Sequence, residues 1–257
     1  MSNSVIRPRG SGEGAVQRPK KLAEVVALKL LDEIRTKGLG EGDPLLPEKQ
    51  MVSELKVGRS TVREALRLLE ARGVIRIRPG ANGGPVVRLP KAKDLADPLG
   101  VWLTFAGASL SDLIAARLCI EPSLAGGAAQ HITTADLALL RTSIDRMKAD
   151  PEDVDVFTGE NAFFHSKIAA IARNPVLQAF VDSVKDVSDG VTVGVSYSPK
   201  RCLAVADAHS RIVDALERKD EQATTTEMRA HLEEARDFWR GHFGRLYSGQ
   251  VNWLELS

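Results

Sequence analysis

Cysteine is scarce in this 257-residue sequence, and long apolar runs are absent. Cys119 and Cys202 lie far apart and outside any Cys-x-x-Cys spacing, which excludes a disulfide framework and a cysteine-based zinc site. No apolar stretch approaches the length that crosses a bilayer, and the polar start MSNSVIRPRGSGEG lacks the apolar core of a secretory signal. We therefore expect a cytoplasmic protein that does not associate with a membrane.

The charged residues are divided unevenly along the chain. Residues 1–90 contain 17 Lys and Arg against 10 Asp and Glu, whereas residues 91–257 contain 18 against 24, so that the net charge of +1 hides two opposite excesses. The chain is long enough for two domains. This division predicts one domain that contacts a polyanion and a second domain with a different task.

Residues 20–90 are predicted to form a helical domain that ends in a hairpin, preceded by a flexible basic arm at 1–19. From Lys20, five apolar residues fall on one helical face: Ala23, Val26, Ala27, Leu30 and Ile34. Pro47 suits the first turn of a second, short helix. After a third helix, VIRIR and PVVRL flank the turn-rich PGANGG and are predicted to be two strands.

The third predicted helix lies in VGRSTVREALRLLEARG, residues 57–73. Ser60 and Thr61 are its predicted N-cap residues, and Glu64 is placed to complete a capping box. Its apolar stripe consists of Val62, Ala65, Leu66 and Leu69. Three helices followed by a hairpin indicate a winged helix-turn-helix.

Three arginines at four-residue spacing, Arg59, Arg63 and Arg67, share an outward flank of this helix. A solvated surface stripe is one interpretation. In a helix-turn-helix, however, this helix enters the major groove by its N-terminal end, where Arg pairs with guanine O6 and N7. We expect Arg59 and Arg63 to contact bases, each at about 1–3 kcal/mol of discrimination. Arg67, one turn deeper, is expected to bind phosphate or to lie on the surface.

The run from Leu45 to Gly84 resembles the DNA-binding domain of GntR-type bacterial transcription regulators. It matches in the Leu, Pro and Glu residues that start the second helix, in the Val-x-Arg-Ser turn and in the Val-Arg-Glu-Ala-Leu core. The resemblance implies DNA contacts at Lys49, Arg59, Ser60, Thr61, Arg63 and the wing residue Gly80. Position 49 is commonly Arg in the family, and Lys keeps the charge but loses the bidentate geometry.

Residues 91–250 are predicted to form an all-helical bundle of six or seven helices, which makes the fold class mainly α. Apolar residues recur there at helical spacing and are punctuated by five prolines: Pro98, Pro122, Pro151, Pro175 and Pro199. The β-like run GVTVGVSYS, residues 190–198, is interpreted as a loop. Gly126 and Gly127 within a helical stretch predict close helix packing.

Three of the five histidines in this second domain, His165, His209 and His231, fall on separate predicted helices. Asn161 and His165 are four residues apart and share a helical face. Asp220 is a predicted cap between the helices of His209 and His231. Three imidazoles from three helices can converge on one divalent ion, although a histidine on a helix is usually only a core or surface residue.

The segments RLCIE from Arg117, NAFFH from Asn161 and HSRIVDAL from His209, with Asp220 and MRAHL from Met228, are similar to the FCD ligand-binding domain of FadR-like GntR regulators. The resemblance implies a divalent ion, with zinc, nickel or manganese as candidates. Its implied ligands are Asn161, His165, His209 and His231. The family often has Asp at the first ligand position, and the neutral amide of Asn161 offers the ion less charge compensation.

The same resemblance implies that Arg117 binds the carboxylate of a small organic acid, for which the guanidinium fork is suited. The alternative is a surface arginine that pairs with Glu121 at i+4.

Together these features predict a bacterial transcription regulator and not an enzyme. We expect a homodimer that binds an inverted-repeat operator in double-stranded DNA and responds to a carboxylate effector. We expect it to be a repressor, because repression is the commoner behaviour in the family that the sequence resembles. Two alternatives stay open: a metal-dependent enzyme fused to a DNA-binding domain, and a metal-free sensor of an apolar or acyl ligand.

Overall fold

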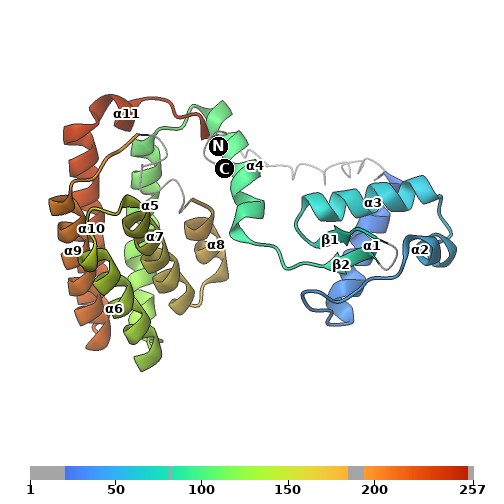
Figure 1. Ribbon diagram of the computed structural model, residues 1–257, viewed down its shortest axis with the longest axis horizontal. Coiled ribbons are helices and arrows are strands. Elements are labelled where there is room, and N and C mark those ends of the chain that lie inside the picture. The colour runs from blue at the N-terminus through green and yellow to red at the C-terminus, as the bar shows by residue number, and fades with distance from the viewer. Residues whose placement is uncertain (1–20, 81–82, 185–193, 254–257) are drawn as a thin grey trace, which may run out of the picture. The chain divides into compact units, whose positions relative to one another are not determined.

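The computed structural model of the protein describes residues 21–80, 83–184 and 194–253, and the chain divides after Pro90 into two compact units (Figure 1). Unit 1 comprises residues 1–90 and unit 2 comprises residues 91–257. The arm predicted at residues 1–19 lies outside the described residues, as do residues 190–193 of the loop predicted at 190–198, and its described residues 194–198 are neither helix nor strand. None of the described helices is long and apolar enough to cross a membrane.

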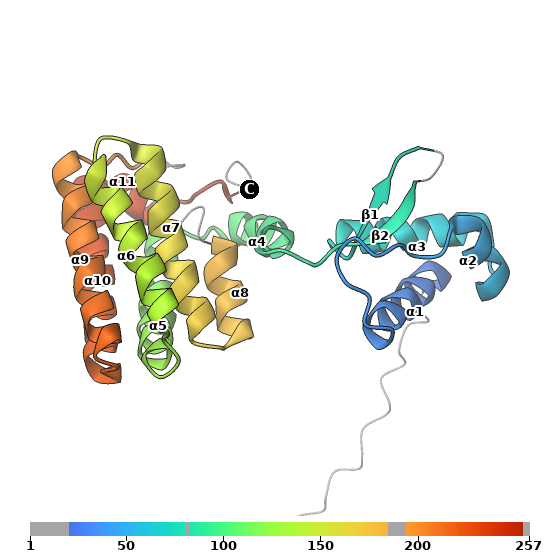
Figure 2. The ribbon, with the colours of Figure 1, turned by 60° about the horizontal axis from the view of Figure 1, so that its bottom comes forward.

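Unit 1 contains three helices and a two-stranded sheet, in the order that the sequence predicts. The elements are α1 Leu22–Thr36, α2 Glu48–Leu55, α3 Arg59–Ala71, β1 Ile75–Arg78 and β2 Gly84–Val87. The two strands are antiparallel, with Ile75 opposite Val87 and Arg78 opposite Gly84. Figure 2 shows this hairpin projecting from the helices as a wing.

The core of unit 1 is built by the predicted apolar faces. Helix α3 buries the whole predicted stripe: Val62, Ala65, Leu66 and Leu69. It packs against the buried face of α1, which includes Val26 and Leu30, while Met51 of α2 and Ile75 of β1 join the same cluster. Between α2 and α3, Lys56 adopts a left-handed conformation, with φ of 54°, that turns the chain sharply. The predicted helix-turn-helix geometry is therefore confirmed.

The predicted capping box at the start of α3 is wrong. The N-cap residue is Gly58, with an extended backbone, and no described side chain caps the helix. Ser60 and Thr61 already lie in the first turn, because the left-handed Lys56 brings the chain into the helix earlier than the hydroxyl residues suggest. The first-turn N–H groups of α3 are consequently not used by a side-chain cap.

All the described helices and strands of unit 2 are helices, as the sequence predicts. Its helices are α4 Ala92–Ala106, α5 Leu110–Ala129, α6 Thr134–Ala149, α7 Val154–Ile171, α8 Pro175–Val184, α9 Pro199–Glu217, α10 Glu221–His242 and α11 Gly244–Ser248. These are eight described helices where the sequence predicts six or seven, and α11, with five residues, is too short to produce a periodic pattern. Pro175 and Pro199 begin helices, whereas Pro98 and Pro122 lie inside α4 and α5.

The long helices α5, α6, α7, α9 and α10 run side by side, and α5 packs against both α7 and α10 (Figures 1 and 2). Gly126 permits the close approach of α10 to α5, since a Cβ there would lie 2.3 Å from Thr225 Oγ1. Gly127 has no such restriction, because its nearest neighbour would be the Ala172 Cβ at 4.0 Å. The predicted close packing thus depends on one of the two glycines. The main core of the bundle lies between these helices and includes Phe164, Ile212 and Leu232.

Candidate functional site

The arginines of α3 are exposed along one flank of unit 1. The side chains of Arg59 and Arg67 are 77% and 72% exposed, and Arg63 between them is exposed as well. The Arg59 Nε donates a hydrogen bond of 2.8 Å to Glu48 Oε1 at the start of α2. This contact ties the first arginine of α3 to the preceding helix and orients its guanidinium on the surface.

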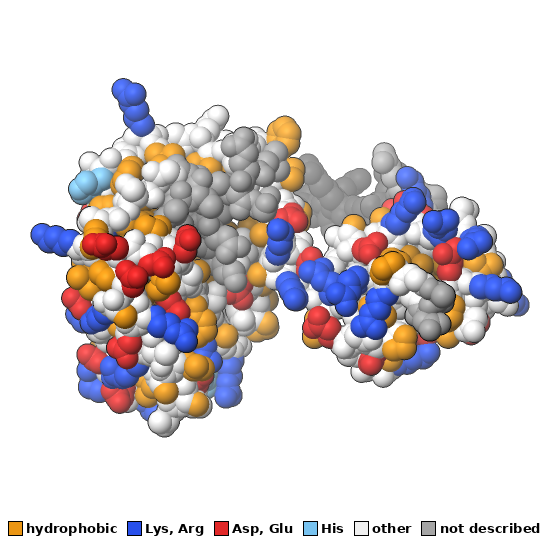
Figure 3. Space-filling view, in the orientation of Figure 1, with side chains coloured by type: hydrophobic (Ala, Val, Ile, Leu, Met, Phe, Trp, Pro, Cys, Tyr) orange, Lys and Arg blue, Asp and Glu red, His pale blue; other side chains and the backbone are white. Residues whose placement is uncertain are grey.

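The other residues predicted to contact DNA lie on three parts of unit 1. Ser60 is exposed and Thr61 partly exposed in the first turn of α3, and Lys49 is exposed in the first turn of α2. Gly80, in the turn of the wing, has φ of +101°, a conformation that favours glycine. Lys and Arg side chains are numerous on the face of unit 1 that Figure 3 shows. The described surface thus offers cations and hydroxyls on α2, α3 and the wing.

The three histidines singled out in the sequence come together inside unit 2. They are His165 on α7, His209 on α9 and His231 on α10, and one nitrogen of each lies within 4.8 Å of the others. All three side chains are buried, and His209 is fully inaccessible. Local sequence fixes the helices that carry them. Asp153 caps α7, Ser198 with Pro199 starts α9, and Asp220 caps α10 by accepting from the Ala223 N–H at 2.9 Å, as predicted.

The His209 ring is held in place by aromatic stacking. Its ring stacks on Phe164 with 3.7 Å between centroids and 6° between planes. Neither of its ring nitrogens has a hydrogen-bond partner among the described residues, and the same is true of the His231 Nδ1. A buried polar atom without a partner costs about 1–3 kcal/mol, and each neutral imidazole has one nitrogen with a free lone pair, so His209 fits a ligand that accepts that lone pair. A metal ion is such a ligand.

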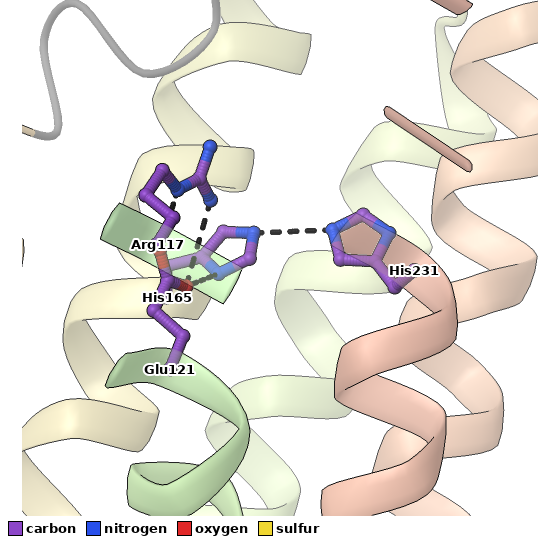
Figure 4. Close-up of polar contacts among 4 residues, drawn as sticks. All are labelled: Arg117, Glu121, His165 and His231. Atoms are coloured by element: carbon purple, nitrogen blue, oxygen red, sulfur yellow. Dashed lines mark hydrogen bonds and ion pairs between the residues drawn. The ribbon is translucent and has the colours of Figure 1, made fainter. Parts of the chain in front are cut away.

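A buried carboxylate, Glu121 of α5, organises the polar side of this cluster (Figure 4). The Glu121 Oε2 lies 2.5 Å from His165 Nδ1, and the Glu121 Oε1 accepts from Arg117 Nε at 2.5 Å. Since a carboxylate only accepts, His165 carries its proton on Nδ1. Its Nε2 therefore presents a lone pair toward His231 Nε2, at 3.2 Å.

The protonation of these groups suits metal ligation. Burial acts to raise the pKa of Glu121, but the charge of Arg117 and the hydrogen bonds from Arg117 and His165 outweigh burial and hold that pKa well below its ordinary value. Burial, reinforced by the neighbouring imidazoles and Arg117, lowers the pKa of both His209 and His231 well below the ordinary value. Glu121 is thus ionised and the two histidines are neutral, as ligands of a cation must be.

A small cavity opens beside the histidines. Its lining combines predicted site residues with apolar walls: Arg117, Phe157, Asn161, His165, Tyr197, Arg201, Val205, His231, Leu232, Ala235 and Trp239. Its volume of about 20 Å³ holds one water or ion and little else. The structure therefore brings Arg117, Asn161, His165 and His231 to one cavity, while His209, the third histidine of the cluster, does not line it.

Two residues near this cavity were missed by sequence reasoning. Glu121 was considered only as a surface partner of Arg117, but the pair is buried, with side chains 5% exposed, so the surface interpretation of Arg117 is wrong. The four-residue spacing of Arg117 and Glu121 was the available signal. No sequence pattern marked Arg201 as a site residue, because its place at the cavity depends on how α9 packs in the bundle.

Comparison with known proteins identifies both units. A family model described as bacterial regulatory proteins of the gntR family matches residues 22–82, and the FCD domain model matches residues 112–234. Two proteins named HTH-type transcriptional repressor NanR are each 29% identical. The one from Salmonella newport strain SL254 aligns over 244 residues and that from Citrobacter rodentium strain ICC168 over 240, with 90% of this chain and 92% of each relative covered. Among solved structures, Streptococcus agalactiae GntR superposes with a TM-score of 0.70 and 26% identity over 84% of this chain and 99% of that one.

Proposed function

Because the chain belongs to the GntR family of bacterial transcription regulators and carries an FCD domain, we propose that it is a repressor whose operator binding is controlled by a small carboxylate. It is a DNA-binding regulator and not an enzyme. In this proposal, residues 20–90 form the DNA-binding domain, preceded by a basic arm at 1–19. Residues 91–250 bind the effector and hold the dimer together.

DNA recognition is assigned to α3 entering the major groove. Arg59 and Arg63 are the base-reading residues, and Arg67 binds phosphate. Exposed hydroxyls and cations around them complete the contact set: Lys49, Ser60, Thr61 and Gly80. The exposed flank of α3 and the uncapped first turn support this assignment, because free N–H groups at a helix start bind phosphate well.

The operator is proposed to be an inverted repeat bound by a homodimer. Two copies related by a two-fold axis present two α3 helices to two half-sites with the same symmetry. Repression is supported by the relatives from Salmonella and Citrobacter, which are named transcriptional repressors.

The sensor site is proposed to hold a divalent ion on His165, His209 and His231, with the Asn161 amide oxygen as a further ligand. When bound, the ion would supply a Lewis-acidic position for an oxygen of the effector. The observation that carries this proposal is the His209 ring, fully buried with both nitrogens unpartnered among the described residues. Three imidazole nitrogens suit zinc or nickel, and the amide oxygen of Asn161 is the kind of donor that manganese prefers. Arg117, on the same cavity, supports an acidic effector, which shifts the operator-binding equilibrium by its differential affinity for the two states.

Two measurements test the proposal. Elemental analysis is expected to find a divalent metal in the purified protein and to find it depleted in a His209→Ala/His231→Ala variant, while His242→Ala, an exposed histidine outside the cluster, retains it. A gel-shift titration with DNA upstream of the protein's own gene is expected to give a sequence-specific complex that small carboxylates weaken. Equal metal in all three proteins would refute the metal site, and the lack of a specific complex would refute the operator assignment.

A further inference from the structure

A second arginine, Arg201 in the first turn of α9, lines the cavity that holds His165 and His231. Its guanidinium lies 4.8 Å from the centroid of the Phe238 ring. Its Nε is buried and has no hydrogen-bond partner among the described residues. A partly buried guanidinium with an unused donor beside a cavity is a site for an acceptor that the described chain does not supply.

The two arginines at this cavity differ in how their charge is compensated. Arg117 is paired with the buried carboxylate of Glu121, which also accepts from His165. For Arg201, no ion pair with a described carboxylate forms, and Phe238 offers only its ring face. Burial accordingly lowers the pKa of Arg201, with attraction from Tyr197 and Glu234 acting in the opposite direction. An anion that enters the cavity is thus attracted most strongly to the cation that lacks a carboxylate.

We propose that Arg201 is the residue that pairs with the acid group of the effector, while Arg117, held by Glu121, adds its charge to the same cavity and acts with Glu121 to orient His165. This assignment rests on the proposed function, because it places the effector in the cavity beside the metal ligands. The fork of Arg201 pairs with a carboxylate through two N–H donors, one of which is the Nε that has no partner within the described residues.

The walls of the cavity define the class of ligand further. Val205, Leu232 and Ala235 contribute apolar surface to the lining that Arg201 and His231 share. Their surface suits the carbon chain of a small monocarboxylate. Because the cavity of about 20 Å³ is smaller than such a molecule, binding requires side chains at its lining to move.

The test is a thermal-shift titration of the metal-loaded full-length protein with acetate, butyrate and neutral butyramide at constant ionic strength. We expect both acids to stabilise the wild-type protein, butyrate more than acetate, and butyramide to have little effect. In Arg201→Gln, the affinity for the acids is expected to fall about tenfold or more, the factor that loss of a charge-assisted hydrogen bond produces. Arg229→Gln, an exposed arginine of α10, is the matched control and should behave as wild type.

Arg201→Lys keeps the charge without the fork and is expected to bind the acids with intermediate affinity. Its melting temperature without acid separates a folding defect from a binding defect. No stabilisation of the wild type by either acid, or equal stabilisation of wild type and Arg201→Gln, would overturn the assignment. Operator binding is measured on the same preparations. A protein that binds acetate through Arg201 but binds no operator supports this assignment and refutes the proposed function.

Discussion

Replacement of Glu121 by Gln is the sharpest perturbation of the proposed metal centre, because it changes one oxygen to an amide and leaves every proposed ligand in place. The Glu121 Oε2 lies 2.5 Å from His165 Nδ1, and its other oxygen accepts from Arg117. If the amide oxygen faces Arg117, the NH2 group faces His165 Nδ1 and moves the imidazole proton to Nε2, the atom proposed to bind the ion. If the amide turns round, its NH2 group meets the Arg117 donor instead.

Both orientations weaken the ion site, and the size of the effect follows from the contacts. Loss of the partner that orients a ligating histidine lowers metal affinity by about 10–100-fold, which is roughly 1.4–2.7 kcal/mol. The same change removes the carboxylate charge from a buried Arg117, and breaking one side of such a pair costs about 3–5 kcal/mol of folding stability. The two effects must therefore be measured apart.

Metal affinity is measured by competition with a chelator of known affinity, and stability by urea denaturation of chelator-treated protein. Glu217→Gln, an exposed glutamate that pairs with Arg141, is the matched control. In the double variant Arg117→Met/Glu121→Leu, stability should recover while metal affinity stays low, because the buried cation of Arg117 is gone but His165 still lacks its acceptor. Nitrogen-15 NMR of the histidine rings reports the tautomer directly. Wild-type metal affinity in Glu121→Gln, with His165 still protonated on Nδ1, would refute the reasoning.

The remaining predictions concern DNA binding and helix packing. Arg63→Ala should cost about 1–3 kcal/mol of operator affinity and relax specificity. Arg67→Ala should weaken specific and nonspecific binding alike and lower the slope of log affinity against log salt concentration by about one. Gel shifts at several salt concentrations check both, and identical effects of the two substitutions would contradict the division of roles. Gly126→Ala should destabilise the protein by about 1–3 kcal/mol, since its Cβ would lie 2.3 Å from Thr225 Oγ1. Gly127→Ala, with its nearest neighbour at 4.0 Å, should stabilise the protein by up to about 1 kcal/mol. Urea denaturation measures both, and the reverse order of stability would be inconsistent with the packing of α10 on α5. Asp220→Ala should cost about 1 kcal/mol by removing the cap of α10 and Asp220→Asn less, and equal stability of all three proteins would argue against the cap.

The sequence by itself determined the architecture of both units, because the signals involved are local. The spacing of Val62, Ala65, Leu66 and Leu69 is enough to show which face of α3 is buried, since a helix repeats every 3.6 residues. Asp220 could be predicted as a cap because an N-cap needs only one side chain and the N–H groups that follow it. The start of α3 was misjudged for a related reason: whether Ser60 and Thr61 cap the helix or lie within it depends on the backbone at Lys56.

Only the tertiary structure decided what surrounds the histidines. Their helical spacing indicated three candidates, but the 4.8 Å cluster exists because α7, α9 and α10 pack together, and no local rule fixes that packing. The exposure of Arg117 and Glu121 was equally undetermined, since a spacing of four residues is the same for a surface pair and a buried pair. Arg201 lies far along the chain from Arg117, and it reaches the same cavity through the fold alone. Side-chain burial and the pairing of charges are properties of the packed bundle. They decide that Arg117 is paired with Glu121 inside the protein and that Arg201 is left to bind a ligand.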